Sequence, residues 1–380
     1  MRSSNETTNS GLGRRRLLLG STLAAALVML AALPVQAQGE KKEVEKKRSA
    51  ERLNGKSMYD WMKDLREKDP SIRERAIAAL KVYGPEAREA SREIIRAIND
   101  KDMSLRVNAI ITLGFIGMDA KDRQDGINAL KGRLLSDTQG IVRFQAASAL
   151  GRLPKGDAYD AIPELIKASH DLSCWEIRAA AVTALGQAGF DPAGNGFDLN
   201  AFHALLQRAA QDTCVEVRLQ AVISLINFGT PGKPADYNTL QGVLKKLRND
   251  EKEHKRVAIL ARVALMRIRP PEGPQTQKYI DGELGPIGKL LRDPELQTRT
   301  MAARAIGAVG EKAKSQVPEL IDALSDLEPQ MVVLTIQALG NIGPAASNSY
   351  NALKRLEQNP DPAVRDAVRV ALEKIGAKGK

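Results

Sequence analysis

From about residue 57 to residue 376, apolar positions recur every three or four residues, which is the spacing of one face of an α-helix. Two kinds of segment alternate. AYDAIPELIKAS (158–169) represents the first kind, and IVRFQAASALG (141–151), which follows an acidic residue, represents the second. Several segments of the second kind end at Gly-Pro, as at Gly84-Pro85 and Gly343-Pro344, which is typical of a helix C-terminus. The pattern predicts pairs of amphipathic helices and an all-α fold.

The second segment carries a repeated phrase: an apolar residue followed by Arg, then Ala three positions later, Leu seven positions later and Gly after that. Successive copies lie between 33 residues (Arg73 to Arg106) and 41 residues (Ala258 to Arg299) apart. Neither helix of a pair can bury its apolar stripe alone, so neighbouring pairs must stack. The arginine position is filled by Arg73, Arg106, Arg143, Arg178, Arg218, Ala258, Arg299, Val332 and Arg365.

These features resemble the HEAT repeat, including the variant known from bilin lyases. The resemblance covers residues 57–376 and implies a right-handed α-solenoid of about nine two-helix repeats. Its most specific element is an acidic residue six positions before an arginine. In the family, such residues form a ladder that runs from repeat to repeat, which implies a structural role. The ladder residues are Asp100 with Arg106, Asp137 with Arg143, Asp212 with Arg218, Asp250 with Arg256, and Asp293 with Arg299.

Some repeats depart from this pattern. In the sixth repeat the Leu265 register puts Ala258 in the arginine position, so its helix must be shifted relative to Arg256. The loops FDPAGNGFD, GTPGKPAD and RPPEGPQ lengthen the middle repeats. At the front, we expect MYDWMKDL to cap the array, with Trp61 covering its open end.

Residues 1–37 are typical of an export signal. Arg14-Arg15-Arg16 precedes an apolar run from Leu17 to Leu33, and Val35 and Ala37 suit a cleavage site. We expect an exported bacterial protein, periplasmic or extracellular, carried by the Sec route or by the twin-arginine route, with no stable membrane insertion after cleavage. An uncleaved segment that anchors the protein is the alternative. Residues 38–56 are predicted to be a charged linker and residues 377–380 a short tail.

The charge balance changes little in this interpretation. The chain carries 57 Lys and Arg against 46 Asp and Glu, a net charge of +11. Loss of residues 1–37 removes four Arg and one Glu, so the net charge becomes 11 − 3, or +8.

Candidate chemistry is sparse. The sequence has three histidines and contains no glycine-rich phosphate loop, no nucleophile elbow and no His-Glu-x-x-His motif, so we expect no catalytic residues, no cofactor and no metal site. Cys174, Cys214 and His254 are each 40 residues apart, at the equivalent position of three successive repeats. A disulfide between Cys174 and Cys214, two free thiols and a metal site with His170 are the alternatives.

In HEAT arrays the second helix lines the concave surface, which implies a groove formed by the positions one and five residues after the arginine. Several of these are apolar, which favours binding of a protein or peptide; burial of the same residues as ordinary core is the alternative. The predicted groove residues are Val107, Ile111, Phe144, Leu219, Ile223, Val333 and Leu334.

We therefore predict a non-enzymatic scaffold or binding module. The same positions offer few cations, which disfavours nucleic acid as the partner. One alternative is a bilin-lyase-like accessory enzyme, and a second is a solenoid that binds an anionic polymer or nucleic acid.

Overall fold

The computed structural model describes residues 52–376 except 155, 191–195, 269 and 271. The predicted signal segment, most of the predicted linker and the tail 377–380 lie outside these residues. The described residues form eighteen α-helices, which make nine consecutive pairs, and no strand. The helices are α2 Met58–Asp64, α3 Pro70–Tyr83, α4 Ser91–Ala97, α5 Met103–Ile116, α6 Arg123–Ser136, α7 Gly140–Leu150, α8 Ile162–Ala168, α9 Trp175–Ala188, α10 Leu199–Gln211, α11 Val215–Phe228, α12 Pro234–Asn249, α13 Lys255–Ile268, α14 Gln275–Lys289, α15 Leu296–Val309, α16 Val317–Ala323, α17 Pro329–Ile342, α18 Tyr350–Arg355 and α19 Pro362–Gly376.

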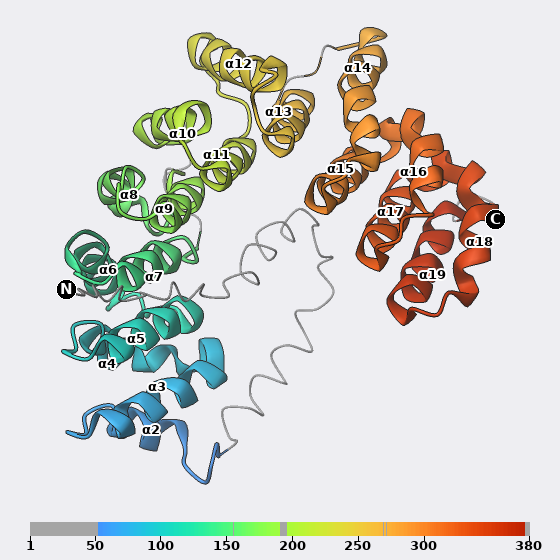
Figure 1. Cartoon of the computed structure of the whole chain (residues 1–380). Helices are drawn as coiled ribbons and strands as arrows, with labels where there is room; N and C mark the ends of the chain where they lie inside the picture. Colours follow the sequence, from blue (N-terminus) through green and yellow to red (C-terminus); the bar gives the residue numbers. More distant parts are fainter. Residues whose placement is uncertain (1–51, 155, 191–195, 269, 271, 377–380) are drawn as a thin grey trace, which may run out of the picture. The chain divides into compact units, whose positions relative to one another are not determined.

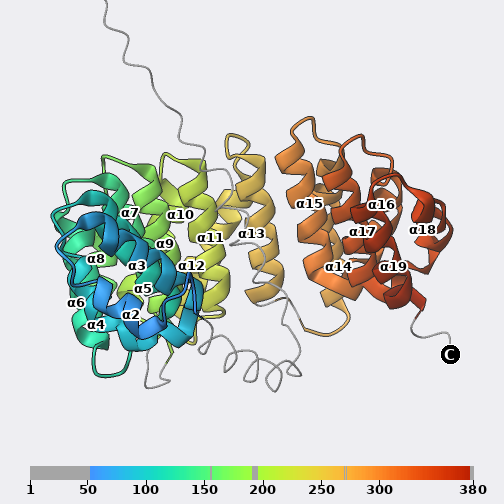
Figure 2. The ribbon, with the colours of Figure 1, turned by 90° about the horizontal axis from the view of Figure 1, so that it is seen from below.

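The helices form two layers (Figures 1 and 2). The even-numbered helices, here called the first helices, lie side by side in one layer. The odd-numbered helices, here called the second helices, form the other layer, and each packs against the second helices before and after it. The predicted all-α solenoid is therefore confirmed. Its core runs between the two layers and consists of Ala, Leu, Ile and Val side chains with few aromatic residues.

Local sequence signals set the ends of the second helices. Asp102 caps α5, because its carboxylate accepts a hydrogen bond of 3.0 Å from the amide of Leu105. Gly117 ends the same helix with a φ of 77°, in the left-handed region that glycine adopts without strain. These two residues therefore fix where α5 begins and where it ends.

Glycine allows adjacent second helices to approach closely. In the repeated phrase this glycine stands eight residues after the arginine position. A Cβ on Gly307 or on Gly340 would lie 3.0 Å from the Cα of an alanine on the next second helix. Ile226 and Met266 occupy the equivalent positions of α11 and α13. Bulkier residues at this contact hold helices further apart, and the contacts of α13 with α11 and α15 are less extensive than those of α17 with its neighbours.

The hydrophobic core consists of two clusters of buried residues, and helix α13 contributes side chains to both of them. Polar contacts supplement packing at this junction. Glu283 of α14 is buried, and it pairs with Arg248 of α12 and with Arg262 of α13, whose Nη1 lies 2.9 Å from Glu283 Oε2. A buried carboxylate between two guanidinium groups therefore links three helices where the apolar contacts are reduced.

Aromatic side chains close the loop between α9 and α10. Phe190 packs edge-on against Phe228, and Phe197 stacks on the same ring, both with centroids 5.1 Å apart. Phe190 and Phe197 also form an isolated β-bridge. Gly189 leaves room for the Phe228 ring, because a Cβ at this position would lie 2.3 Å from it. Phe190 and Phe197, on either side of the lengthened loop, therefore both pack on one buried ring of α11.

Candidate functional site

The ladder arginines connect successive repeats. Arg106 donates to both carboxylate oxygens of Asp137, at 2.8 and 3.2 Å, and Asp137 belongs to the next repeat. Its Nη1 also donates to the main-chain carbonyl of Asp100, at 3.0 Å. The acidic residue six positions earlier thus supplies a carbonyl to its own arginine, while its carboxylate accepts from the preceding repeat, as Asp100 does from Arg73 at 2.8 Å.

The same geometry recurs along the stack. Arg178 holds Asp212 through two hydrogen bonds of 2.9 Å. Burial raises the pKa of Asp212, but hydrogen bonds from Arg178 and from the Cys214 amide outweigh it and the pKa is lowered. The other rungs join Arg143 to Asp171, Arg218 to Glu253, and Arg299 to Asp326.

The sixth repeat corrects the prediction that Asp250 and Arg256 form a rung. Asp250 accepts from the amide of Lys252 and stabilises the turn before α13. Lys255 reaches Asp293, at 2.6 Å. Arg256 lies between Glu216 of the preceding repeat, at 3.5 Å, and Glu295 of the next, at 3.9 Å. The physical reason is the shifted register: Ala258 occupies the arginine position, so the two preceding basic residues, Lys255 and Arg256, make the contacts between repeats.

Cys174 and Cys214 are free thiols, so the disulfide considered from the sequence is absent. Each is the residue that precedes a second helix, and each thiol donates to a glutamate two residues later: Glu176 at 2.8 Å and Glu216 at 3.2 Å. Burial and then this hydrogen bond raise the pKa of both thiols. Both Sγ atoms therefore contact their own helices and are held protonated at neutral pH. His254 occupies the equivalent position before α13, and the described residues contain no group of three metal-binding side chains.

The predicted groove residues divide into two classes. Leu219 is only 6% exposed and belongs to the core, because neighbouring second helices cover it, so its assignment to a groove is wrong. The others are half-buried at the solvent side of the second helices. Most also pack against the core, and this applies to Val107, Phe144, Ile223, Val333 and Leu334.

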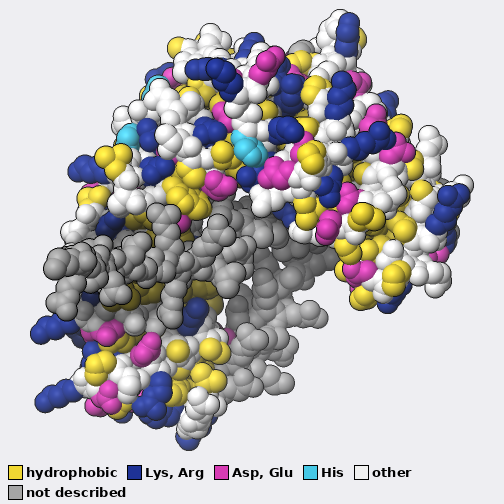
Figure 3. All heavy atoms as spheres, viewed as in Figure 1, with side chains coloured by type: hydrophobic (Ala, Val, Ile, Leu, Met, Phe, Trp, Pro, Cys, Tyr) yellow, Lys and Arg dark blue, Asp and Glu magenta, His cyan; other side chains and the backbone are white. Residues whose placement is uncertain are grey.

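Larger exposed apolar side chains lie on α3, α5 and α7. Val82 is 65% exposed and Phe115 is 50% exposed, and Met103 and Ile141 are exposed to a lesser degree. Figure 3 shows hydrophobic side chains beside Lys and Arg over α3. We call the following set the α5 patch: Val82, Met103, Val107, Ile111, Phe115, Ile141 and Phe144.

Val82 and Phe115 follow a simple rule that the sequence prediction did not use. Each stands nine residues after the repeat arginine, that is, one further turn along the helix from the position five residues after it. Extending the predicted stripe by that turn would have found both residues. In α5 the stripe then runs from Val107 through Ile111 to Phe115.

Two cations flank Phe115. The Nζ of Lys81, from α3, lies 5.1 Å from the ring centroid, and the guanidinium carbon of Arg152, which follows α7, lies 4.9 Å from it. Burial lowers the pKa of Arg152. Three successive repeats therefore build one small site that combines an exposed aromatic ring with two positive charges.

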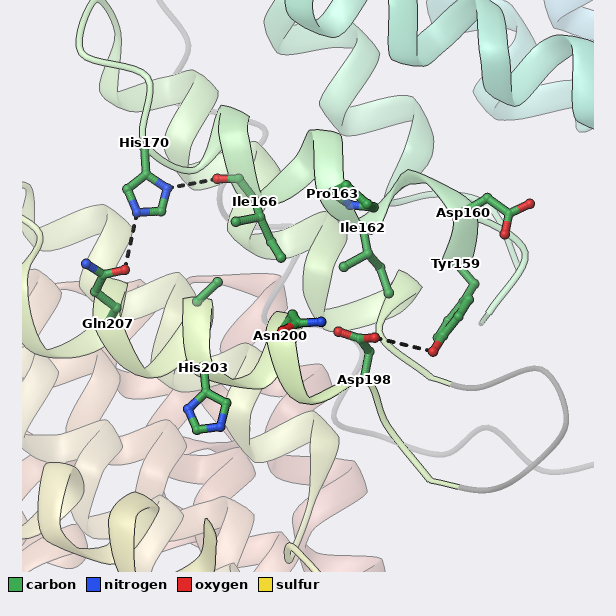
Figure 4. Close-up of a pocket in the computed structure, with 11 residues that line it drawn as sticks. Tyr159, Asp160, Ile162, Pro163, Ile166, His170, Asp198, Asn200, His203 and Gln207 are labelled. Carbon is green, nitrogen blue, oxygen red and sulfur yellow. Dashed lines mark hydrogen bonds between the residues drawn. The ribbon is translucent and has the colours of Figure 1, made fainter.

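A second hollow lies in the other layer, between α8 and α10 (Figure 4). It has a volume of about 700 Å³, with Ile162, Pro163 and Ile166 among its lining residues. His170 bridges the carbonyl of Ile166 and the side chain of Gln207 there. Tyr159 and Asp198, which also line the cleft, form a hydrogen bond of 3.3 Å, and the part of the chain that the structure describes has no group of three side chains that could hold a metal ion here.

The comparisons with known proteins agree with this architecture. A family model described as HEAT repeats matches residues 60–151 and 127–195. Residues 60–195 are HEAT repeats, and the helix pairs that follow them have the same arrangement. No curated protein matches it. In the described part of this HEAT-repeat chain, no helix has the length and apolar character that crossing a membrane requires.

Solved structures similar to this HEAT-repeat chain have low sequence identity. An engineered protein is 18% identical, with a TM-score of 0.43 over 92% of this chain and 98% of its own. Importin beta in an ammonium sulfate condition is 16% identical, with a TM-score of 0.47 over 93% of this chain and 50% of its own.

A third match is a chain of the structure in which Kap95p binding induces the switch loops of RanGDP to adopt the GTP-bound conformation. It is 15% identical, with a TM-score of 0.52 over 93% of this chain and 49% of its own. The HEAT-repeat chain thus spans about half the length of these last two chains, and at these identities the likeness shows the fold alone.

Proposed function

We propose that this HEAT-repeat protein is a binding module or scaffold for another protein, which docks apolar side chains on the α5 patch. The observation that carries the proposal is the clustering of exposed large apolar residues on three adjacent second helices. The Phe115 ring is half exposed and the Val82 side chain is about two-thirds exposed. Their contact with water is unfavourable, and a bound partner would remove it.

The setting of the patch suits binding. Helix α5 packs between α3 and α7, and the arginine ladder ties all three repeats together. A surface on rigid, adjacent helices loses little conformational freedom when a partner binds, which favours affinity. A central apolar area with charged residues at its edge is also the usual composition of a protein interface.

The test is a comparison of two variants that should both fold. The first replaces Val82 and Phe115 by Ser, and the second replaces the almost fully exposed Leu172 and Leu327 by Ser at turns outside the patch. Proteins captured by the wild-type chain are identified by mass spectrometry, and binding of the purified partner is then measured by calorimetry. We expect the patch variant to bind at least about tenfold more weakly, as for central interface residues, and the turn variant to bind normally.

Circular dichroism of both variants shows whether the fold is intact. Normal partner binding by a folded patch variant would remove the α5 patch from consideration.

We also propose that residues 1–37 direct export, on the basis of the three arginines, the apolar run and the small residues at 35 and 37. N-terminal sequencing of the protein from its native source checks this. A mature chain that begins near Gln38 is the expected result, and a chain that still begins at residue 1 would favour the uncleaved anchor.

A further inference from the structure

The two cations beside Phe115 differ from the ladder arginines in lacking a counter-charge. Neither Lys81 nor Arg152 forms an ion pair or a side-chain hydrogen bond with any residue in the part of the chain that the structure describes. The ladder arginines, by contrast, contact carboxylates of the next repeat, as Arg106 contacts Asp137. Two positive charges therefore converge on the apolar α5 patch and leave their N–H donors available.

The donor groups indicate the chemistry of a ligand. A guanidinium and an ammonium carry several N–H donors and no acceptor, and they form charge-assisted hydrogen bonds with carboxylates and phosphates. The carboxylate is the one that Asp and Glu side chains of a partner protein carry. Packing against the Phe115 ring favours these positions of the two cations before a ligand arrives. A carboxylate bound here would remain beside exposed apolar side chains.

The neighbours favour a peptide over a nucleic acid. Single-stranded nucleic acids bind through aromatic faces on which bases stack and through several cations that follow the backbone. Here one aromatic ring is exposed, cations already lie over it, and the next side chains along the surface, Val82 and Ile111, are aliphatic. Aliphatic neighbours suit the side chain of a partner protein.

We infer that the partner presents an acidic segment in which a large apolar or aromatic residue stands next to Asp or Glu. The apolar side chain packs on Val82, Ile111 and the exposed edge of Phe115, and the neighbouring carboxylate binds Lys81 and Arg152. This inference rests on the proposed function, because it names the kind of segment that the α5 patch recognises.

The experiment uses short fluorescein-labelled peptides and fluorescence anisotropy with the full chain. One peptide contains Phe flanked by Asp, a second contains Phe flanked by Lys, a third contains Asp without Phe, and oligothymidylate is the nucleic-acid probe. The test variant carries Lys81→Glu and Arg152→Glu. The control variant carries Lys278→Glu and Lys314→Glu, which reverses two exposed lysines elsewhere on the surface.

We expect the Asp-Phe peptide to bind the wild-type chain and the control variant, and to bind the test variant at least about tenfold more weakly. Added salt should weaken the wild-type complex, since the pairs are near the surface. The Lys-Phe peptide should show the opposite preference and bind the test variant better than the wild type. A charge swap of this kind cannot result from loss of fold.

Other outcomes separate the two proposals. If Phe115→Ser removes partner binding while charge reversal changes neither the partner nor the peptides, the α5 patch stands and the acidic segment is overturned. Oligothymidylate that binds as tightly as the Asp-Phe peptide also overturns the inference. If neither the apolar nor the charge variants affect partner binding, the proposed function fails as well.

Discussion

Close contact between α9 and α11 depends on Gly186, and replacing it with alanine tests whether the glycines of the repeat set the spacing of the second helices. A Cβ at this position would lie 2.6 Å from Ser224 Oγ and 2.7 Å from Ser224 Cβ. Both distances are shorter than any normal contact. A new rotamer of Ser224 would move its Oγ but not its Cβ, so the two helices must move apart. That movement would lengthen or break the hydrogen bond of 3.1 Å from Ser224 to the carbonyl of Val182.

The magnitude follows from opposing terms. Overpacking of this kind costs about 1–3 kcal/mol, and loss of the buried hydrogen bond adds about 1 kcal/mol. Alanine favours the helix over glycine by about 1 kcal/mol. Gly186→Ala should therefore destabilise the protein by about 1–3 kcal/mol. Gly242, in the middle of α12, has no atom within 4 Å of the place where a Cβ would stand, so Gly242→Ala should stabilise by up to about 1 kcal/mol.

Urea unfolding followed by circular dichroism compares the two variants. Repeat arrays do not always unfold in one step, so hydrogen exchange of α9 and α11 locates the effect. Ser224→Gly removes the side chain that the new Cβ meets and leaves only the Ser224 Cα, 3.2 Å away, so in that background Gly186→Ala should be much less destabilising. Equal stabilisation by Gly186→Ala and Gly242→Ala, or an undiminished cost in the Ser224→Gly background, would refute the role of close helix contact.

Three further predictions concern buried polar groups. Because the hydrogen bonds from Arg178 lower the pKa of Asp212 despite its burial, the stabilisation from this carboxylate is complete above about pH 4, the ordinary range of Asp, and is lost as pH falls through the lower native pKa. Asp212→Asn should cost about 3–5 kcal/mol at neutral pH and reduce the acid sensitivity of urea unfolding; unchanged stability at neutral pH would contradict the ladder's role. Glu283→Gln should cost about 3 kcal/mol and increase hydrogen exchange in α14 before the other helices; uniform exchange would argue against a polar link at α13. Cys174 and Cys214 should react with a disulfide reagent more slowly than free cysteine, because their thiol pKa values are raised, and two thiols should titrate without reductant after denaturation; a smaller count would indicate a disulfide.

Sequence alone specified much of the ladder but not its pairing. The spacing between Asp137 and Arg143 is visible in one repeat, because it reflects the turn between two helices. Which carboxylate each arginine binds depends on the neighbouring repeat, and the structure shows Arg106 on Asp137 rather than on the side chain of Asp100. The two possibilities have the same sequence signature, since every repeat carries both residues.

The exposed surface was harder to predict for a related reason. Leu219 and Val107 occupy equivalent positions, yet Leu219 is buried and Val107 is half-buried. Periodicity identifies the face of a helix, but exposure depends on how closely the adjacent helices pack and on the size of the side chains between them. The contact between Phe115 and Arg152 is an example: the two residues lie in different repeats, and they meet because the repeats stack.

The sequence by itself determined the helices, their pairing and their stacking, because these follow from local periodicity, capping residues and a repeated apolar stripe that no single pair can bury. Only the tertiary structure decided which carboxylate each ladder arginine binds, that the two thiols contact their own glutamates, and which apolar side chains stay exposed. Those features depend on distances between helices from different repeats, and such distances are set by packing of the whole stack.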